Sequence, residues 1–500
     1  RRGTQLQRLP TGIAPHGAVG VSLSPDQWVE AHLGPIAEAL SSIVFYTVPI
    51  AGTDVPLIVM WTAVAGLFFT FYLRLINVRA LWLAIRHARG DFADPDARGE
   101  ISHFKAVATA VSGTVGVGNI GGVAVAISLG GPGAAFWLFI AGLLSMSTKL
   151  VECTLGVKYR RYNADGSVSG GPMFYMEAYF RERGWPGIGK GFGSFYALAL
   201  VIGCLGIGNM FQSNQAFAQF VVITGGETSF FADRGWLFGL ALAAVIAAVI
   251  IGGIRSIARV AAVLVPVMGL IYVIAAVVVI GLSAEHLPAA LALVVSEAFT
   301  GQAASGGILG AMVIGFQRAL FSNEAGIGSA SIAHSAVKTE RPASEGITAL
   351  LEPFIDTVVV CSLSSLVVLT TAIPQGLMGS GLAGIELTSA AFAWHFSWAP
   401  YVIAVAALLF AFSSALAWSY YGLKGWTYLL GEGKVKSVVF QLIFCAFIAL
   451  GCMLELRAVL DFSDAMTFLI ALPNVFMLYL FAPLVRREVG QYLAAIKAER

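Results

Sequence analysis

The sequence predicts an all-α integral membrane protein with about eleven transmembrane helices, built as a five-plus-five inverted repeat with two discontinuous helices. Three observations predict this fold class: an apolar composition, a series of long apolar windows, and two matching glycine-rich interruptions. Of the 500 residues, 58% are hydrophobic and only 12% are charged, with a mean hydropathy of +0.81. Because soluble proteins carry about 25% charged residues, this composition excludes a string of soluble domains.

Eleven apolar windows account for the helices, since about 20 apolar residues cross a bilayer as a helix. They lie near residues 56–77, 103–128, 133–157, 193–222, 235–252, 256–282, 304–334, 345–372, 398–423, 437–455 and 458–484. The windows divide the chain into an N-terminal extension (1–55), a first helix with its loop (56–102), two five-helix repeats (103–302 and 303–485) and a tail (486–500). In the extension, segment 26–48 mixes Asp26, Glu30, His32 and Glu38 with apolar residues at helical spacing, which predicts an interfacial helix.

Charge, cysteine content and motifs narrow the function classes further. A formal net charge of +2 gives no basis for nucleic-acid binding. The five cysteines lie in or at the ends of apolar runs, so we expect packing residues and neither metal ligands nor disulfides. The HExxH, GxSxG and CxxC motifs do not occur, so the sequence offers no standard catalytic constellation.

Two of the predicted helices are interrupted in the same way. Residues 112–119 read SGTVGVGN, and residues 321–329 read FSNEAGIGS. Each contains Gly-x-Gly followed by Asn or Ser, and each opens a block of five helices. Since five is odd, the second block must be inverted relative to the first, which is typical of secondary transporters with discontinuous helices. A single Gly-x-Gly would more often serve close helix packing, but two at matching positions favour unwound backbone whose free groups bind ligands.

Several longer motifs carry a resemblance to one family. These are GTVGVGNIGGVA at 113–124, GGPMFY at 170–175, GNMFQSN at 208–214, NEAGIGSA at 323–330 and FIDT at 354–357. Together they resemble the sodium:alanine symporters, the alanine or glycine:cation symporter family, over about residues 55–485. The resemblance implies a leucine-transporter-like fold and sodium-coupled uptake of alanine, glycine or similar small amino acids.

Three positions depart from the family pattern. Val117 stands where the family usually has Thr, Ser331 where it has Pro, and Ser413-Ser414 where it has Ser-Thr. The last change keeps both hydroxyl groups. Val117 removes a hydroxyl beside the implied substrate site, so fine specificity is left open.

The resemblance implies a substrate site at the first interruption. Backbone N–H groups around Val117 and Gly118 would bind the substrate carboxylate with help from the helix dipole. Gln212 would add a hydrogen bond, and aromatic side chains would form the wall of the side-chain pocket. The implied substrate contacts are Gly113, Gly116, Val117, Gly118, Gln212, Phe316, Phe321, Ser414 and Trp418.

The resemblance also implies bound Na⁺, a hard cation that prefers oxygen ligands, and it implies no organic cofactor. For one ion the implied ligands are the carbonyls of Ser112 and Val115 with the hydroxyls of Ser413 and Ser414. A second ion would use Thr114 and Asn119 near the substrate carboxylate. The two adjacent serines could instead bond to carbonyls one turn earlier on their own helix, and this alternative stays open.

Six ionisable residues lie inside the predicted spans. Each isolated charge costs about 2.5–3.5 kcal/mol there, so we expect each to have a partner or to line water. Arg318 with Glu324 or Asp356 would make a gating pair. The six are Arg318, Glu324, Glu352, Asp356, Asp461 and Asp464.

These observations predict a sodium-coupled symporter of small neutral amino acids in a bacterial or archaeal plasma membrane, with no enzymatic step and no required oligomer. Two alternatives stay open. The first is proton coupling, with Asp356 or Glu324 as the carrier. The second is a non-transporting membrane sensor or a multispan enzyme. A sensor would bind ligand without flux, and an enzyme would need a reactive group.

Basic residues predict the orientation of the chain in the membrane. If the first helix begins outside, 23 of the 30 Lys and Arg residues lie on the inner side and five on the outer side. This asymmetry follows the positive-inside rule and places the N-terminus outside and the C-terminus in the cytoplasm.

The orientation predicts that segment 159–190 and the tail after residue 485 face the cytoplasm. A cysteine introduced near Gly166 should therefore resist an impermeant maleimide in intact cells and react after permeabilisation. A matched cysteine at Glu227, in a loop predicted to lie outside, should react in intact cells. Labelling of the first site from outside would show that the orientation is reversed.

Overall fold

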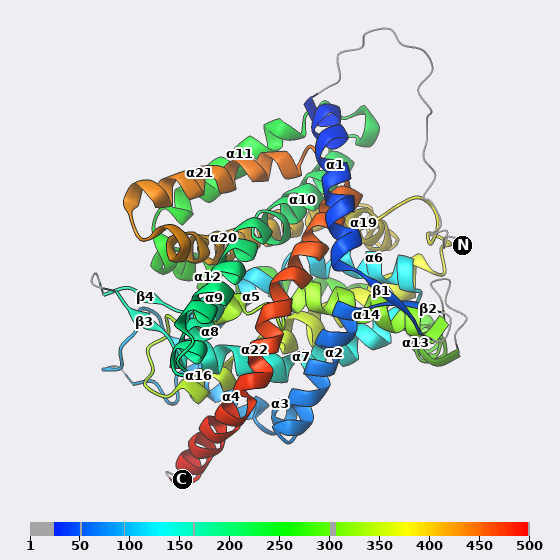
Figure 1. Cartoon of the computed structure of the whole chain (residues 1–500). Coiled ribbons are helices and arrows are strands. Elements are labelled where there is room, and N and C mark those ends of the chain that lie inside the picture. Colours follow the sequence, from blue (N-terminus) through cyan, green and yellow to red (C-terminus); the bar gives the residue numbers. More distant parts are fainter. Residues whose placement is uncertain (1–24, 51–52, 95, 164–165, 301–306, 499–500) are drawn as a thin grey trace.

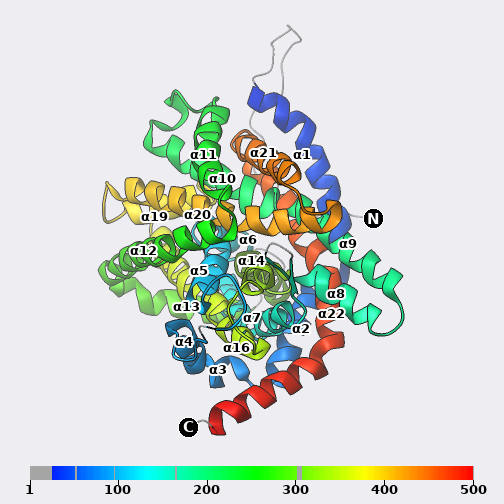
Figure 2. The same cartoon turned by 90° about the vertical axis from the view of Figure 1, so that its left-hand side faces the viewer.

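The structure is a computed structural model that describes residues 25–50, 53–94, 96–163, 166–300 and 307–498. This part of the chain is a bundle of helices with two short hairpins at its edge (Figures 1 and 2). In Figure 2 the helices α7 (Gly133–Lys158) and α14 (Gly307–Asn323) lie at the centre, with other long helices around them. The all-α fold class predicted from the sequence is confirmed.

The first part of the described chain precedes the two repeats. Its helix α1 packs along α22, which is consistent with a helix near segment 26–48, although its position relative to a membrane stays a prediction. The hairpin pairs Thr47 with Pro56 in antiparallel register. The elements are α1 (Pro25–Val44), β1 (Thr47–Ile50), β2 (Thr53–Pro56), α2 (Leu57–Tyr72), α3 (Ile76–Arg79) and α4 (Leu81–Arg89).

The first predicted repeat begins with a broken helix. Here α5 and the η1–α6 segment together are apolar enough to cross a membrane, but they bend by 59° at the break between them. The elements are α5 (His103–Thr114), η1 (Val117–Asn119), α6 (Gly121–Gly130), α7, β3 (Arg161–Tyr162), β4 (Val168–Ser169), α8 (Pro172–Arg181), α9 (Pro186–Gly203), η2 (Gly206–Met210), α10 (Phe211–Ile223), η3 (Gly226–Thr228), α11 (Gly235–Ile250), α12 (Gly253–Leu282), η4 (Ala284–His286) and α13 (Leu287–Thr300).

The second predicted repeat also begins with a broken helix, α14 followed by α15. The predicted boundary between the repeats, at 302–303, lies outside the described residues, and the domain division stays a prediction. The elements after α14 are α15 (Ser329–His334), α16 (Pro342–Thr348), α17 (Leu351–Pro353), η5 (Phe354–Cys361), α18 (Ser362–Val367), η6 (Val368–Ala372), α19 (Ile385–Ala393), α20 (Ala399–Leu430), α21 (Lys434–Gly451) and α22 (Leu456–Ala498).

Within the described residues, each apolar window predicted from the sequence overlaps helix in the structure. By length and composition, seven helical segments of the described chain can cross a membrane, and the bent pair makes an eighth. The helices α2 and α11 are apolar but shorter, at 16 residues each. The predicted number of eleven crossings is therefore not confirmed.

The two interruptions lie where the sequence predicts them, and glycine supplies close approach at the first and left-handed backbone at the second. At the first, Gly116 is extended between the end of α5 and η1. At the second, Gly326 and Gly328 have φ of +92° and +85°. Glu324, which directly follows α14, has φ of +57°. Positive φ is rare for residues other than glycine, so the conformation of Glu324 is imposed by its surroundings.

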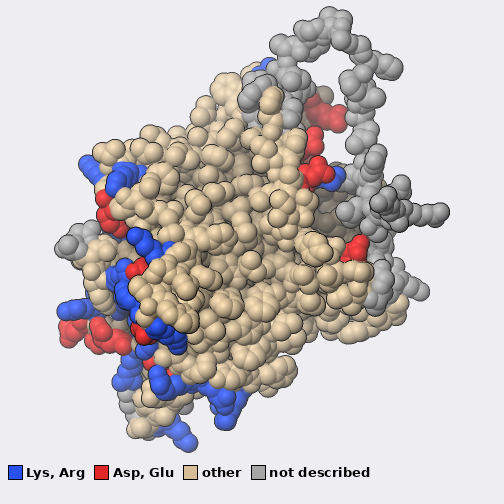
Figure 3. All heavy atoms as spheres, viewed as in Figure 1, with Lys and Arg blue, Asp and Glu red and all other residues tan. Residues whose placement is uncertain are grey.

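Charged side chains gather on one side of the molecule, which we call the basic face. In Figure 3, Lys and Arg concentrate at the lower left, over the side that carries β3, β4, α4 and the C-terminal end of α22 in Figure 1. The broad middle of the view is almost free of charge, as expected for a surface in contact with lipid. Arg1, Arg2 and Arg8, which are counted on the outer side in the predicted orientation, lie outside the described residues, and the orientation stays a prediction.

Candidate functional site

The unwound backbone of the first broken helix is held by two side chains. The Gly116 N–H donates to Oδ1 of Asn119 at 2.8 Å, and the Val117 N–H donates to Oε1 of Gln212 at 2.9 Å. All four residues are buried. The structure thus brings together Gly116, Val117 and Gln212, as the resemblance implies. The Val117 N–H, which the resemblance assigns to the substrate carboxylate, donates here to Gln212.

Oxygen atoms of α5 and α20 meet beside this break. The Ser112 hydroxyl donates to the Ser413 carbonyl at 2.6 Å, and the Ser413 hydroxyl lies 3.4 Å from the Ser112 carbonyl. The Ser413 hydroxyl also lies 3.2 Å from the carbonyl of Phe410, so the bond within its own helix is present. The Ser414 hydroxyl is buried without a hydrogen-bond partner, and a Cβ on Gly116 would lie 2.6 Å from it.

A buried carboxylate joins the two broken helices. Asp356, in η5, accepts from Asn119 at 2.6 Å, from the Ser322 hydroxyl at 2.8 Å and from the Thr357 hydroxyl at 2.7 Å. Asn119 belongs to the first break, and Ser322 lies at the end of α14. The sequence singled out Asp356 as an ionisable group within a span but did not connect it to Asn119.

Thr114, which the resemblance places with Asn119 in a second ion site, directs its hydroxyl to its own helix instead. Its hydroxyl lies 3.4 Å from the carbonyls of Ala110 and Val111 on its own helix. Val115 ends α5 and is also buried. Asn119 therefore contacts Asp356 and the Cys361 thiol, while the hydroxyl of Thr114 bonds within α5.

The second break is closed by Trp418 of α20. Its indole N–H donates to Oε1 of Glu324 at 2.8 Å, and the Ser329 hydroxyl donates to the other oxygen of that carboxylate. Trp418 is fully buried, and a Cβ on Gly208 would lie 1.9 Å from its ring. Only glycine fits at that point of the π-helical turn η2, so Trp418 is fixed between the break and α10.

The two phenylalanines implied for the pocket wall lie in different places. The Phe321 ring packs edge-on against Phe211 with ring centroids 5.1 Å apart, and both rings lie 3.7 Å from a Cβ built on Gly118. The Phe316 ring instead lies 6.4 Å from that of Trp137. Phe321 thus borders the first break, while Phe316 faces α7. Gly113 is a packing position, since a Cβ there would lie 3.3 Å from Ala417 and Tyr421 of α20.

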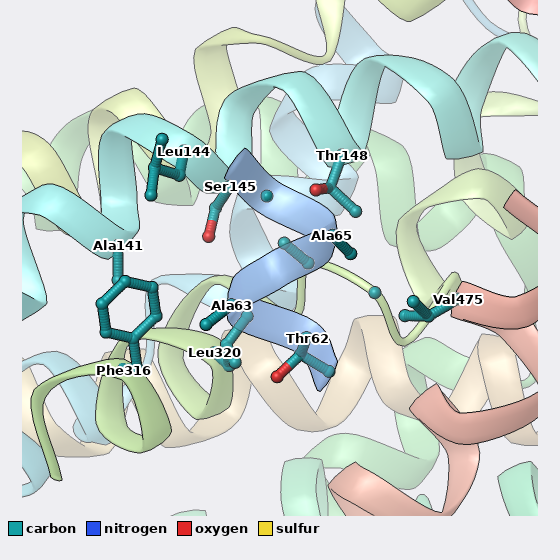
Figure 4. Close-up of a pocket in the computed structure, with 13 residues that line it drawn as sticks. Thr62, Ala63, Ala65, Ala141, Leu144, Ser145, Thr148, Phe316, Leu320 and Val475 are labelled. Carbon is teal, nitrogen blue, oxygen red and sulfur yellow. The ribbon is translucent and has the colours of Figure 1, made fainter. Parts of the chain in front are cut away.

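Phe316 lines a small cavity between α2, α7, α14 and the second break (Figure 4). The cavity measures about 10 Å³, which is room for a water molecule and far too little for an amino acid. Its lining residues are Thr62, Ala63, Ala65, Gly66, Ala141, Leu144, Ser145, Thr148, Phe316, Leu320, Ala325, Gly326 and Val475.

The predicted gating pairs of Arg318 are wrong. Its guanidinium forms an ion pair with Asp464 of α22, to which Gln317 also donates at 3.0 Å. Glu324 and Asp356 have the neutral partners described above. Asp464 lies 146 residues from Arg318 in the sequence, so spacing alone could not identify it.

Two helix breaks that meet inside an apolar bundle, with hydroxyl, amide and carbonyl groups turned toward each other, define a secondary transporter. The chain belongs to the sodium:alanine symporter family, whose model matches residues 38–500. It is a multi-pass membrane transporter of the sodium-coupled amino-acid symporter class and not an enzyme.

Individual relatives agree with this assignment. The chain is 35% identical over 431 residues to the sodium/alanine symporter AgcS of Methanococcus maripaludis, covering 85% of this chain and 92% of AgcS. It is 33% identical to the probable sodium/glutamine symporter GlnT of Bacillus subtilis, covering 87% of each. Its fold is similar to that of MhsT in complex with L-phenylalanine, with a TM-score of 0.51 and 15% identity over 78% of this chain and 99% of MhsT.

The close approach at Gly116 makes a specific prediction. In Gly116→Ala the new methyl group would lie 2.6 Å from the Ser414 hydroxyl and 2.7 Å from the Gln212 amide oxygen. Overpacking of this kind costs about 1–3 kcal/mol, so we expect transport to fall sharply in proteoliposomes while the protein remains folded. Gly122→Ala is the matched control, because nothing lies within 4 Å of a Cβ there. Equal activity of the two variants would show that the space at Gly116 is not required.

Proposed function

We propose that this transporter couples Na⁺ influx to uptake of alanine, glycine or another small neutral amino acid across the plasma membrane, with its N-terminus outside. The observation that carries the proposal is the meeting of Ser112, Ser413 and the unpartnered Ser414 hydroxyl beside the first break. Burying a hydroxyl without a partner is costly, and a bound cation would satisfy it.

The first ion would be bound between α5 and α20. Its ligands would be the carbonyls of Ser112 and Val115 and the hydroxyls of Ser413 and Ser414. The hydrogen bond of Ser413 to Phe410 does not conflict with this role, because a hydroxyl that donates its proton keeps lone pairs for a cation. All-oxygen coordination suits a hard cation.

The second ion would be bound at Asp356 rather than at Thr114. The carboxylate of Asp356, to which the Asn119 amide donates, and the hydroxyl oxygens of Ser322 and Thr357 offer a negative site between the two broken helices. A cation there would balance a buried negative charge, which otherwise lacks a charged partner among these contacts.

The substrate carboxylate would bind the backbone N–H groups at Val117 and Gly118. The Val117 N–H is bonded to Gln212 in the structure, so substrate binding would exchange one acceptor for another at the same donor. The Phe211 and Phe321 rings at Gly118 and the indole of Trp418 would limit the side chain to about one or two carbons.

The energetics of one Na⁺ per cycle are sufficient for accumulation. Moving one charge through 100 mV yields about 2.3 kcal/mol, and a tenfold sodium gradient adds about 1.4 kcal/mol. Together these would support a concentration ratio of a few hundred for a neutral amino acid.

Uptake of labelled alanine into proteoliposomes tests the proposed function. We expect uptake with a Na⁺ gradient and none when choline replaces Na⁺, and we expect glycine to compete while leucine does not. Leucine competing as well as alanine would contradict the small pocket. Uptake that persists in choline and follows a proton gradient would favour proton coupling. A relative with 30% identity, YrbD of Bacillus subtilis, is described as a putative sodium/proton-dependent alanine carrier.

The proposed first ion site predicts the behaviour of Ser414→Ala. Loss of one ligand in a dry site costs about 1–3 kcal/mol, so the half-saturating Na⁺ concentration should rise roughly five- to 150-fold. Because coupling is reciprocal, alanine affinity should fall at fixed Na⁺ and recover at high Na⁺.

The control for that experiment is Ser419→Ala, five residues further along α20. The Ser419 hydroxyl is buried but bonds to the carbonyl of Leu416 at 2.7 Å, so its removal should leave the Na⁺ dependence unchanged. An unchanged half-saturating Na⁺ concentration in Ser414→Ala as well would remove Ser414 from the ion site.

A further inference from the structure

A cluster of buried ionisable side chains lies between the broken helices and the basic face, apart from the groups assigned above. At its centre, both ring nitrogens of His334 contact carboxylates. Nδ1 lies 2.5 Å from Oε1 of Glu345, and Nε2 contacts Oε1 of Glu352. The three side chains are fully buried and come from α15, α16 and α17.

The number of available donors shows that this arrangement holds an additional proton. A neutral imidazole has one N–H donor and one acceptor nitrogen, whereas an ionised carboxylate only accepts. Two hydrogen bonds from one ring to two carboxylates therefore require either an imidazolium or a protonated carboxyl group. Imidazole is the more basic of the two groups, so the proton belongs on His334.

The balance of buried charge leads to the same conclusion. Lys149 of α7 lies 3.5 Å from Oε2 of Glu352, and both are fully buried. With His334 as imidazolium, two carboxylates face two cations, and the group is neutral. With both His334 and His103 neutral, one negative charge would be left without compensation in a dry interior, which is strongly unfavourable.

Other titratable groups face the cluster, and a protonated His103 would also balance one carboxylate, so the proton is assigned to His334 by its two hydrogen bonds to carboxylates. Glu345 also contacts His103 at the start of α5. If Glu152 or Glu324 is ionised, it adds negative charge and favours the proton further. The Cys153 thiol and the Tyr421 hydroxyl are neutral when protonated. The groups that face the cluster are His103, Glu152, Cys153, Glu324 and Tyr421.

A metal ion is the alternative occupant. Ligand atoms of Cys153, His334 and Glu352 lie within 4.8 Å of one another. However, both nitrogens of His334 already face carboxylates, and the ammonium group of Lys149 beside Glu352 would repel a second cation. The charges therefore favour a proton.

We propose that His334 is a proton-binding site of the transport cycle, occupied while the basic face is closed and emptied when α5 and α15 part. The proposal rests on the proposed function for its role in a cycle. In the structure that face is closed by parallel pairing of Ile101 with Val337 and by Arg160, whose guanidinium donates to the Val337 carbonyl at 2.6 Å. Opening would separate His103 of α5 from Glu345, admit water to the cluster and allow His334 to release the proton.

A chain of aromatic groups leads from the cluster toward the basic face. The rings of His103 and His87 lie 5.7 Å apart, and Nε2 of His87 lies 2.9 Å from the hydroxyl of Tyr492. Burial and the neighbouring His103 lower the pKa of His87 to about 4, so its ring is neutral at physiological pH. Its Nδ1 is buried without a partner and can accept a proton.

The test is nitrogen-15 NMR of histidine side chains in the full-length protein at pH 8.5, where an ordinary histidine is about 1% protonated. We expect one signal from a doubly protonated ring. It should vanish in His334→Gln and in Glu352→Gln, which removes one negative charge, and persist in His286→Gln, a partly exposed control outside the cluster. The absence of any doubly protonated ring from the wild-type spectrum would decide against the proposal even if a variant fails to fold. Only neutral rings at pH 8.5, or stoichiometric zinc in the purified protein, would overturn the proposal.

A transport assay tests the release step separately. With Na⁺ and alanine saturating and opening of the basic face limiting the cycle, uptake should rise with pH on that face by up to about tenfold per unit, because a lower proton concentration favours the deprotonated, open state. This dependence should disappear in Glu352→Gln and remain in His286→Gln. A flat wild-type profile would contradict a role in the cycle. Absence of any alanine uptake would instead contradict the proposed function, and the NMR result would still decide the proton site.

Discussion

The rest of the structure depends on the backbone groups that the two helix breaks leave without helical partners. Inside an apolar layer each such group needs a hydrogen bond, and water cannot supply it. At the first break the Ile120 carbonyl accepts from Thr388 at 2.9 Å. At the second, the carbonyls of Gly326 and Ile327 accept from Asn474 and Tyr196, each at 2.8 Å. Polar side chains of the surrounding helices therefore take the place of the missing helical bonds.

Because these partners belong to other helices, the breaks cannot change without affecting the scaffold. Gln212 connects the first break to α10, and Ser413 connects it to α20. Trp418, one turn beyond Ser414 on α20, reaches Glu324 at the second break. One straight helix thus contacts both breaks, which gives a physical route by which a cation at Ser414 would influence a substrate beside Trp418.

The breaks could be predicted from the sequence, but most side-chain pairs around them could not. Glycine beside Ser, Thr and Asn within an apolar window is a local signal, and both interruptions lie where that signal occurs. In contrast, Asn119 and Asp356 are 237 residues apart, and Ser112 and Ser413 are 301 apart. The second pair could be anticipated only through a family resemblance. For the first pair, and for Arg318 with Asp464, the sequence showed buried charge without indicating its partner.

Two kinds of contact around the breaks differ in the free energy needed to separate them. The bonds to the unwound backbone come from neutral amides and hydroxyls, and exchanging such a bond for a ligand costs or gains about 1 kcal/mol. Breaking a buried ion pair, such as Arg318 with Asp464 or Lys149 with Glu352, costs about 3–5 kcal/mol while it stays dry. Ligand binding in the closed state should therefore proceed through the neutral contacts. The charged groups, including His334 between its carboxylates, can separate only when water enters, which is the event that opens one face of a transporter.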